Sequence, residues 1–228
     1  MSYKILMSSL ALSLTPLLNA EEKSCWVYLG AYAKGEEQGI TLCKLDRTKG
    51  KLDKVKVFGG HQNPAFLEVH PSGKFLYAVN EIKDFKGNSA GAVTAFSIDP
   101  KTGDLKKLNQ VSSRGMGSCH LTIDPKGKTL LVANYGGGSV ASFRIGEDGV
   151  LSEAVSFFQH EGSSVDERRQ KGPHAHSINV DPAGKRAYCA DLGLDKVLVY
   201  KLSKKGKLKP NDPSFVKTQP GGGPRHFN

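Results

Sequence analysis

The stretch GSCHLTIDPKGKTLLVANY, from Gly117 to Tyr135, decides the fold of this chain because it joins two apolar strands through a tight Pro-x-Gly-Lys turn. Apolar and polar residues alternate on both sides of the turn, as they do in antiparallel strands. The same pattern occurs in NPAFLEVHPSGKFLYAVNE, residues 63–81, and in HAHSINVDPAGKRAYCADL, residues 174–192. The sequence therefore contains an internal repeat that begins with a β-hairpin.

Each repeat continues with two further strands. The third strands are GAVTAFSI from Gly91, GSVASFRI from Gly138 and DKVLVYKL from Asp195, and a Gly-containing turn leads from each to a fourth strand. A four-stranded antiparallel unit of about 50 residues has the size of one propeller blade. Because a single blade cannot bury both of its faces, blades must stack in a ring. We predict an all-β fold of the β-propeller class.

The two ends of the sequence contain partial repeats. The first begins at the second strand of a blade, with WVYLGAY from Trp26, and the last, GPRHFN at residues 223–228, is the opening of another inner strand. We therefore expect about four blades and an incomplete ring. The propeller domain would cover residues 21–228 and would be truncated within a blade.

The first twenty residues differ from the repeats. Lys4 precedes an apolar run at residues 5–18, and Ala20 precedes a charged stretch. This is the layout of a secretory signal peptide, and the apolar run is too short for a stable membrane span. We expect residues 1–20 to direct export to the periplasm or the extracellular space, with no membrane span left after cleavage. If the segment is not a signal, the chain is either anchored or cytoplasmic.

The chain has a formal net charge of +10, so a nucleic acid is the first partner to consider. The lysines do not form one reading face along the sequence. They fall in the expected turns, as at residues 126–128 and 203–207. We therefore expect no nucleic-acid partner. Solvated turns explain the lysines, and weak attraction for an anionic small molecule is the alternative.

Cysteine and histidine spacing gives no sign of a metal site. The four cysteines, at positions 25, 43, 119 and 189, lack the spacing of zinc ligands, and both disulfides and buried free thiols are compatible with it. His174 and His176 alternate on one strand, but no third ligand is fixed beside them. We expect neither a metal nor a cofactor. Cys119 is not expected to act as a nucleophile with its neighbour His120, because adjacent strand residues face opposite sides.

Propeller geometry brings the start of every inner strand to one mouth of a central channel. In an antiparallel hairpin the start of one strand lies beside the end of the other. Counting outward from each Pro-x-Gly-Lys turn gives the expected neighbours Asn63 with Glu81, His120 with Asn134, and His176 with Asp191. Arg225 and His226 fall at the matching position of the next repeat. We therefore predict that polar and ionisable side chains from several blades meet at this mouth.

Such a set of side chains can hydrolyse an ester-like carbonyl. A histidine or a carboxylate takes a proton from water as general base, and His120 and Glu81 are the candidates. Arg225 would stabilise the oxyanion or bind a phosphate or carboxylate through two N–H groups. The remaining candidates for substrate contacts are His174, His176, Asp191, Asn134 and His226. Each residue also has a structural explanation, in which Glu81 and Asp191 cap strand ends and Asn134 stabilises a turn.

The segments SCHLTIDPKGKTLLVANYGGGSV, GPHAHSINVDPAGKRAYCADLGLDKV and GGGPRH together resemble successive signatures of the lactonase family of seven-bladed β-propellers. The resemblance covers roughly residues 26–228, and a generic repeat propeller does not supply this combination. It implies hydrolysis of 6-phospho-D-glucono-1,5-lactone to 6-phosphogluconate, without a cofactor. It also implies that the mouth residues are Glu81, His120, His174, His176, Asp191, Arg225 and His226.

Other functions remain compatible with the sequence. Export would favour an unphosphorylated sugar lactone or another cyclic ester over the phosphorylated one. A non-catalytic exported propeller could bind a ligand at the same mouth. A cyclase of the muconate type would use the mouth to form a lactone instead of opening one.

Overall fold

A computed structural model describes residues 23–32, 35 and 39–227. The secretory segment expected at residues 1–20 lies outside the described residues. Within the described part of the chain, no helix is long and apolar enough to cross a membrane.

All regular structure of the described residues is β, in four antiparallel sheets that we call blades 1 to 4. Blade 1 contains β1 (Ser24–Leu29), β2 (Gly39–Asp46) and β3 (Lys51–Gly59). Blade 2 contains β4 (Leu67–Val69), β5 (Phe75–Asn80), β6 (Ala92–Ile98) and β7 (Leu105–Ser112). Blade 3 contains β8 (Ser118–Ile123), β9 (Thr129–Asn134), β10 (Ser139–Arg144) and β11 (Ser156–Gln159). Blade 4 contains β12 (Ala175–Val180), β13 (Arg186–Asp191), β14 (Lys196–Leu202) and β15 (Leu208–Lys217).

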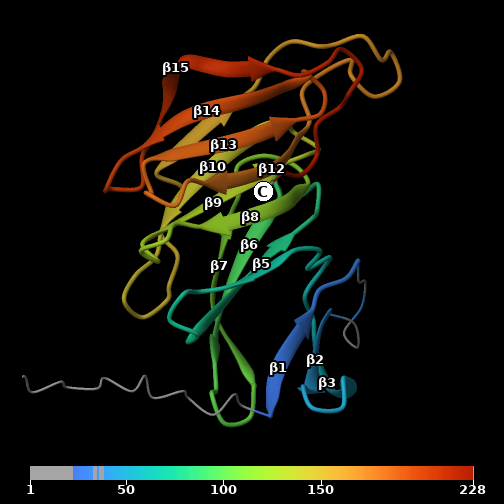
Figure 1. The fold of residues 1–228 in the computed structure, drawn as a ribbon, viewed down its shortest axis with the longest axis vertical. Coiled ribbons are helices and arrows are strands. Elements are labelled where there is room, and N and C mark those ends of the chain that lie inside the picture. Colours follow the sequence, from blue (N-terminus) through green and yellow to red (C-terminus); the bar gives the residue numbers. More distant parts are fainter. Residues whose placement is uncertain (1–22, 33–34, 36–38, 228) are drawn as a thin grey trace, which may run out of the picture.

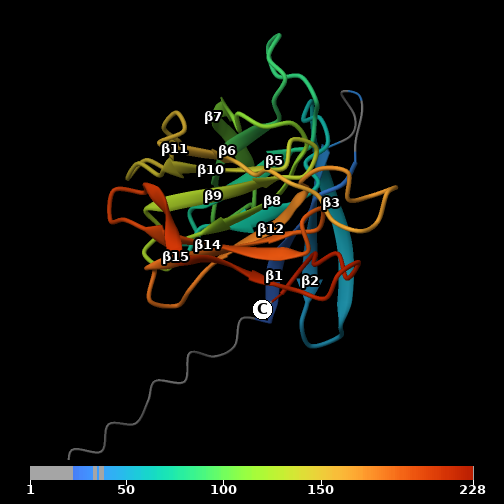
Figure 2. The ribbon, with the colours of Figure 1, turned by 90° about the horizontal axis from the view of Figure 1, so that it is seen from above.

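The strand order confirms the predicted repeat and the all-β class. In every blade the strands lie side by side in chain order, and three described blades have four strands while blade 1 has three. Figure 1 shows the blades in succession along the longest axis, from blade 1 at one end to blade 4 at the other. The inner strands β8 and β12 lie side by side, which can also be followed from above in Figure 2.

A β-bulge changes the register at the start of β8. Asn134 pairs with Ser118, whereas His120 pairs with Ala133. His120 therefore lies one position from Asn134, near it as predicted but not directly opposite it. The extra residue, Cys119, slips the inner strand by one position without disturbing the rest of the hairpin.

A second bulge lies at the start of β12. Ala175 pairs with Asp191, and the register shifts directly after it, so that His176 is the bulged residue and not the partner of Asp191. The third expected pair is confirmed. Asn63 Nδ2 donates to the carbonyl oxygen of Glu81 at 3.0 Å, and Glu81 N donates to the carbonyl oxygen of Asn63 at 3.0 Å.

The apolar core lies between blades, as expected for sheets that each bury both faces. Blades 1 and 2 share a cluster around Ile40, Leu76 and Phe96. Blades 2 and 3 share a larger one that includes Tyr77, Leu130, Val132 and Phe143, and blades 3 and 4 share one that includes Leu131, Ile178 and Tyr200. Each such side chain contributes roughly 1.5–3 kcal/mol through burial, so each blade depends on its neighbour for stability.

A hydrogen bond to a glycine carbonyl also joins each pair of neighbouring blades. In each case a hydroxyl of one blade donates to a glycine in the turn between the third and fourth strands of the next blade. The three bonds are Tyr28 Oη to Gly103 O at 2.8 Å, Tyr77 Oη to Gly149 O at 2.9 Å, and Ser142 Oγ to Gly206 O at 2.7 Å. We call this contact the glycine clasp.

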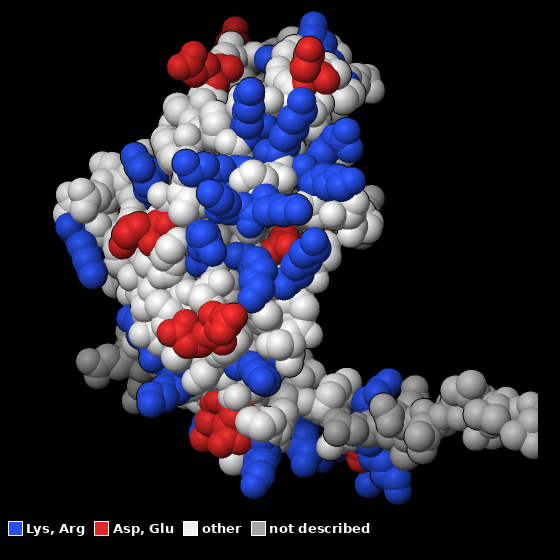
Figure 3. All heavy atoms as spheres, turned by 90° about the vertical axis from the view of Figure 1, so that its left-hand side faces the viewer, with Lys and Arg blue, Asp and Glu red and all other residues white. Residues whose placement is uncertain are grey.

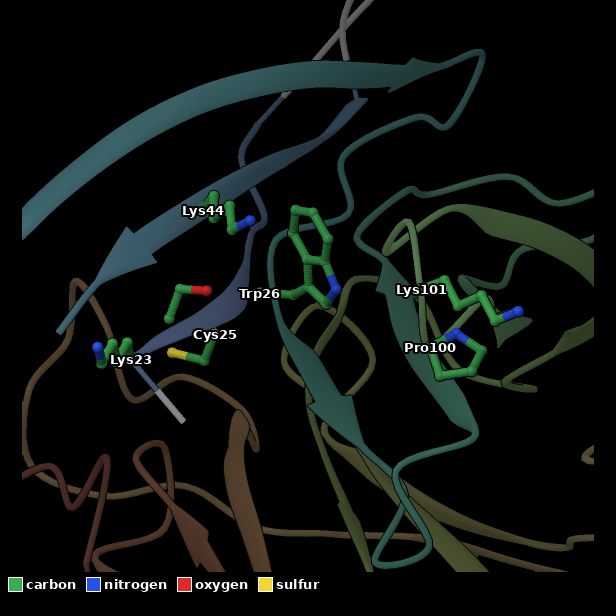
Figure 4. A pocket seen from close by; sticks show the side chains of 7 residues that line it. Lys23, Cys25, Trp26, Lys44, Pro100 and Lys101 are labelled. Carbon is green, nitrogen blue, oxygen red and sulfur yellow. The ribbon is translucent and has the colours of Figure 1, made fainter. Parts of the chain in front are cut away.

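Glycine is required in the clasp for two reasons. The φ angles of Gly103, Gly149 and Gly206 are 73°, 81° and 77°, in the left-handed region that favours glycine. A Cβ at Gly103 would also lie 2.8 Å from the ring of Trp26, and one at Gly149 would lie 2.3 Å from the ring of Phe75. Figure 4 shows Trp26 beside the pocket of about 390 Å³ that it lines together with residues of this turn.

We expect Gly149→Ala to lower the free energy of unfolding by about 3 kcal/mol, because it combines backbone strain with a clash against Phe75. Urea unfolding of the purified chain measures the loss. The control is Gly73→Ala, since Gly73 has a φ of 71° but no atom within 4 Å of the added Cβ. It should cost only the backbone strain, about 1 kcal/mol. Equal losses in the two variants would contradict the clasp.

Candidate active site

Three segments bring a group of cationic and imidazole side chains together at the mouth. The ring of His120 on β8 lies 5.7 Å from that of His226, and the ring of His226 lies 4.9 Å from that of His176 on β12. Arg225 Nε donates a hydrogen bond to His176 Nε2 at 3.0 Å. The C-terminal end that carries Arg225 and His226 lies against β8 and β12 in Figure 1. We call these four residues the histidine cluster.

Two imidazoles of the cluster, those of His120 and His176, are weak bases. Burial lowers the pKa of His120 from 6.5 to about 4, and the neighbouring His226 and His176 add to this shift. Burial lowers the pKa of His176 to about 4 as well, with a further contribution from the positive charge of Arg225. His120 and His176 are therefore neutral near pH 7 and can share the mouth with a guanidinium group.

Hydrogen bonds indicate which nitrogen of each ring carries the proton. Ile178 N donates a long hydrogen bond of 3.4 Å to His120 Nδ1, which places the proton of the neutral ring on Nε2. His176 accepts from Arg225 through Nε2, so its proton is on Nδ1. His120 thus offers an N–H donor rather than a free lone pair. His176 holds the guanidinium of Arg225 in place.

Glu81 supplies a carboxylate at the same mouth. It directly follows β5, and Tyr32 Oη donates to its Oε2 at 2.7 Å. Burial raises the pKa of Glu81, and the hydrogen bond from Tyr32 opposes this rise without cancelling it. Tyr32 is 71% exposed, so blade 1 reaches this carboxylate with a side chain that is open to solvent. A carboxylate with a raised pKa is well suited to accept a proton.

Cys119 directly precedes His120 on β8, and the charges of both Glu81 and Arg225 influence the pKa of its thiol. Burial raises the pKa of the thiol to about 12, Glu81 raises it further, and Arg225 opposes the rise. The Sγ atom donates to the carbonyl oxygen of His176 at 3.3 Å. A thiol that stays protonated is a poor nucleophile, which agrees with the prediction for Cys119. Cys119, Cys25, Cys43 and Cys189 are all free thiols.

Tyr135 forms an aromatic platform beside the cluster. His174 stacks on it with ring centroids 4.6 Å apart, and His176 meets it edge-on at 5.4 Å. Arg169 Nη2 donates to Tyr135 Oη at 3.0 Å, and its charge contributes to the lowered pKa of His176, after the larger effects of burial, Arg225 and His226. Two guanidinium groups therefore lie near His176: that of Arg225 binds it directly, and that of Arg169 is joined to it through Tyr135.

Two of the predicted substrate contacts are buried within the blades. Asn134 is fully buried and bonds to Ser118 Oγ and Ser139 Oγ at 3.0 and 3.1 Å. Asp191 is also fully buried, and His160 Nδ1 donates to its Oδ2 at 2.6 Å. Neither side chain is exposed at the mouth. The structure thus favours the structural explanation for Asn134.

Asp191 instead connects an interior network to the mouth. His160, which it binds, also contacts Tyr200 Oη through Nε2 at 2.8 Å. The other carboxylate oxygen of Asp191 accepts the backbone N–H of His174 at 2.8 Å and that of Gly193 at 3.0 Å. Asp191 therefore fixes the backbone of His174, the residue that stacks on Tyr135. Sequence analysis did not single out His160.

Asp195 orders two further segments of the mouth. Its carboxylate accepts from Ser164 Oγ at 2.5 Å and from Gln170 Nε2 at 2.8 Å, both in the loop that carries Arg169. It also accepts the backbone N–H groups of Gly221 at 2.6 Å and Gly223 at 2.7 Å, just before Arg225. Burial by itself raises the pKa of Asp195, but these hydrogen bonds outweigh it and lower the pKa.

The structure therefore brings together most of the predicted site. Arg225, His226, His120 and His176 meet directly, and Glu81 and His174 lie around them. The sequence prediction missed Tyr32 and Arg169, which lie in loops outside the repeated segments. It also missed Tyr135, which occupies the repeat position of Glu81. Among the described residues, no group of three or more His, Cys, Asp or Glu side chains is arranged to hold a metal ion.

Comparison with known proteins shows to which family the chain belongs. A family model described as lactonase, 7-bladed beta-propeller, matches residues 26–228. The chain belongs to this lactonase family. The resemblance stated for the repeat segments and the mouth motifs is thereby confirmed.

Named relatives in the lactonase family are about one-third identical to the chain over the residues that align. A 6-phosphogluconolactonase of Bacillus subtilis is 34% identical over 200 residues, which are 88% of this chain and 55% of the relative. The crystal structure of a putative 6-phosphogluconolactonase from Bacteroides fragilis is 32% identical with a TM-score of 0.82, and the match covers 91% of this chain and 58% of that one. The structure of a periplasmic gluconolactonase from Pseudomonas aeruginosa is 33% identical with a TM-score of 0.81, covering 89% and 58%. The chain thus spans little more than half the length of these relatives.

We expect His120 to make the stability of this lactonase-family chain depend on pH. Its pKa is about 4 in the folded chain and near 6.5 in the unfolded chain, so the folded state binds fewer protons between these values. The stability is fully present above pH 6.5 and is lost as the pH falls towards 4. Between pH 7 and 4 the wild type should lose on the order of 2 kcal/mol more than His120→Gln in urea unfolding.

Glu68 provides a control, because its effect on the pH dependence of stability has the opposite sign to that of His120. This β4 residue accepts from Ile123 N of β8 at 3.2 Å, and burial raises its pKa from 4.5 to about 7. Its contribution is present below pH 4.5 and is lost as the pH rises through 7. Glu68→Gln should therefore alter the pH slope in the direction opposite to His120→Gln. The same change of slope in both variants would refute the assignment for His120.

Proposed function

We propose that this protein hydrolyses a sugar lactone, with 6-phospho-D-glucono-1,5-lactone as substrate and 6-phosphogluconate as product. Two kinds of observation support the proposal. The named relatives of the chain are 6-phosphogluconolactonases and a gluconolactonase. The mouth offers a carboxylate, neutral imidazoles and guanidinium groups, which are the groups that opening an ester-like ring requires.

The single observation that carries the proposal is the hydrogen bond from Arg225 Nε to His176 Nε2 beside the neutral ring of His120. A cation held by a neutral imidazole keeps its full charge for an anionic ligand. The N–H of His120 adds a second donor that carries no charge. Together they are suited to a carbonyl oxygen on which negative charge develops.

Glu81 is the better candidate for the general base. Of the two residues considered, His120 accepts a hydrogen bond at Nδ1 and is protonated at Nε2, whereas Glu81 is a carboxylate with a raised pKa. Glu81 would take one proton from a water molecule while the water oxygen bonds to the lactone carbonyl carbon. The ring C–O bond then breaks, and the proton passes from Glu81 to the released ring oxygen, leaving the hydroxy acid.

The phosphate of the substrate has a binding candidate in the second guanidinium group. Arg169 is held by Tyr135, whose ring meets that of His176 edge-on, whereas the exposed Arg225 binds His176 directly. Arginine binds phosphate through two parallel N–H groups. This arrangement favours the phosphorylated over the plain sugar lactone, so the phosphorylated lactone should show the higher kcat/KM.

The purified chain should open 6-phospho-D-glucono-1,5-lactone faster than the spontaneous reaction, in an assay of acid release at constant pH. Glu81→Gln should lower kcat by on the order of 100-fold or more, because the amide cannot take the proton from water. A rate no greater than the spontaneous one, with either the phosphorylated or the plain lactone, would refute the proposal.

Tyr32→Phe is the matched control for the role of Glu81. It keeps the carboxylate but removes the hydrogen bond that lowers the pKa of Glu81. The acid limb of the pH–rate profile should therefore move to higher pH, while kcat at alkaline pH is retained. An unchanged profile in Tyr32→Phe would assign the proton transfer to another group.

We further propose that residues 1–20 direct export of the protein. The positive residue, the short apolar run and the small residue before a charged stretch support this role, and one relative is described as periplasmic. Expressed at full length in a bacterial host, the exported protein should begin near Glu21, as measured by mass spectrometry of the periplasmic fraction. An intact N-terminus found only in the cytosol would contradict export.

A further inference from the structure

The turns opposite the mouth carry most of the net positive charge. In blades 2 to 4 the first and third strands run away from the mouth, as does β2 of blade 1, so the turns that follow these strands share the opposite face. These seven turns are residues 46–51, 70–74, 99–104, 124–128, 144–150, 181–186 and 201–209. They contain 15 Lys and Arg against 7 Asp and Glu, which accounts for eight of the ten net positive charges of the chain. We call this surface the turn face, and Figure 3 shows the basic side chains gathered on it.

The acidic residues of the turn face are largely engaged by their own turns. The carboxylate of Asp124 accepts the backbone N–H groups of Lys128 and Thr129 at 2.7 and 2.6 Å. Asp181 accepts that of Lys185 at 2.6 Å in the equivalent turn of blade 4. Asp46 and Asp99 bind backbone N–H groups of their turns in the same way. These carboxylates shape the turns, and Asp46 also pairs with a lysine of the face, Lys49, at 3.9 Å.

The highest density of charge lies on the β14–β15 hairpin. A shallow groove of about 760 Å³ is lined there by Lys201, Lys204, Lys205, Lys207 and Lys209. All five are exposed, and none of them forms an ion pair with any part of the chain that the structure describes. The glycine clasp fixes the hairpin, because Ser142 Oγ of blade 3 holds the carbonyl oxygen of Gly206. Five like charges on a fixed hairpin repel one another unless an anionic partner is present.

We propose that the turn face docks onto an anionic phospholipid surface, with the β14–β15 hairpin as its strongest contact. Each lysine near such a surface adds electrostatic attraction, and because the ammonium group acts as a point charge, it needs no defined binding geometry. Twelve of the fifteen basic residues of the turn face are lysines, and they come from turns spread over four blades. An array of point charges distributed over one face fits an extended charged plane better than a single small ligand.

A nucleic acid fits the turn face less well. None of the seven turns contains Phe, Tyr or Trp, and Trp26, which lies beside the turn at Gly103, is half-buried. The face therefore offers few aromatic side chains on which unpaired bases could stack. It also has few arginines, the residues that most often read bases and phosphates through two N–H groups. The proposal is independent of lactone hydrolysis. Docking by this face would leave the mouth, on the opposite side, open to solvent.

Co-sedimentation of the full 228-residue chain with vesicles tests the proposal. Vesicles of phosphatidylglycerol and phosphatidylcholine should bind the chain, and vesicles of phosphatidylcholine alone should not. Binding should fall steeply with salt, because exposed charges are screened. The triple variant K204Q/K205Q/K207Q should reduce the affinity by on the order of tenfold or more.

The matched control is K83Q/K86Q/K171Q, which removes the same charge from exposed lysines of the mouth loops. It should retain the binding of the wild type, and circular dichroism verifies that both variants keep their β-structure. Equal losses in the two variants would show that only net charge matters and would overturn the proposal. Absence of binding to the anionic vesicles would also overturn the proposal. Tighter binding of a DNA duplex or a single-stranded RNA than of the vesicles, lost in K204Q/K205Q/K207Q, would assign the face to nucleic acid instead.

Discussion

The structure depends on contacts between neighbouring blades more than on any contact within a blade. Apolar clusters join each pair of neighbouring sheets, so blades 2 and 3 bury both of their faces, and the glycine clasp adds a hydrogen bond at each of these contacts. The clasp works because a glycine in the left-handed region exposes its carbonyl oxygen and has no Cβ that would displace the ring packed on it. Because the clasp recurs at the same turn in successive blades, it fixes the angle between them and thereby the position of every inner strand relative to the mouth.

The chemistry of the mouth follows from the irregular register at the start of the inner strands. Bulges at Cys119 and His176 interrupt the regular register where β8 and β12 begin. In β12 the extra residue is His176 itself, which leaves the regular pairing. In β8 the extra residue is Cys119, whose thiol occupies the space between the strands. As a result the imidazoles of His120 and His176 approach a common point together with Arg225. An ideal β12–β13 hairpin would have placed His176 opposite Asp191, whereas His120 keeps Ala133, the partner that the regular register gives it.

Most of the fold was predictable from the sequence because the repeat fixes it: alternating apolar residues and a Pro-x-Gly-Lys turn define the strands, their order and their antiparallel pairing. The convergence of His120, His176, Arg225 and His226 could also be predicted, since it requires only that repeat-equivalent positions meet at one end. The bulges could not, because a single inserted residue leaves the apolar pattern almost unchanged. Asp191 was assigned to the mouth for the same reason, whereas its burial depends on His160, which lies outside the repeated segments. Tyr32 and Arg169 escaped prediction because irregular loops have no period from which a position can be counted.

The carboxylate of Asp195 has a consequence for how the mouth responds to ligands. One side chain holds both the loop that carries Arg169 and the glycine segment that precedes Arg225. The two guanidinium groups therefore cannot become ordered or disordered independently, since loosening one segment removes hydrogen bonds that also restrain the other. A molecule that binds Arg225 alone therefore also orders the loop of Arg169. This reduces the conformational entropy that the loop loses when a second anionic group of the molecule binds there. The mouth is thus built to favour ligands with two separated negative centres over ligands with one.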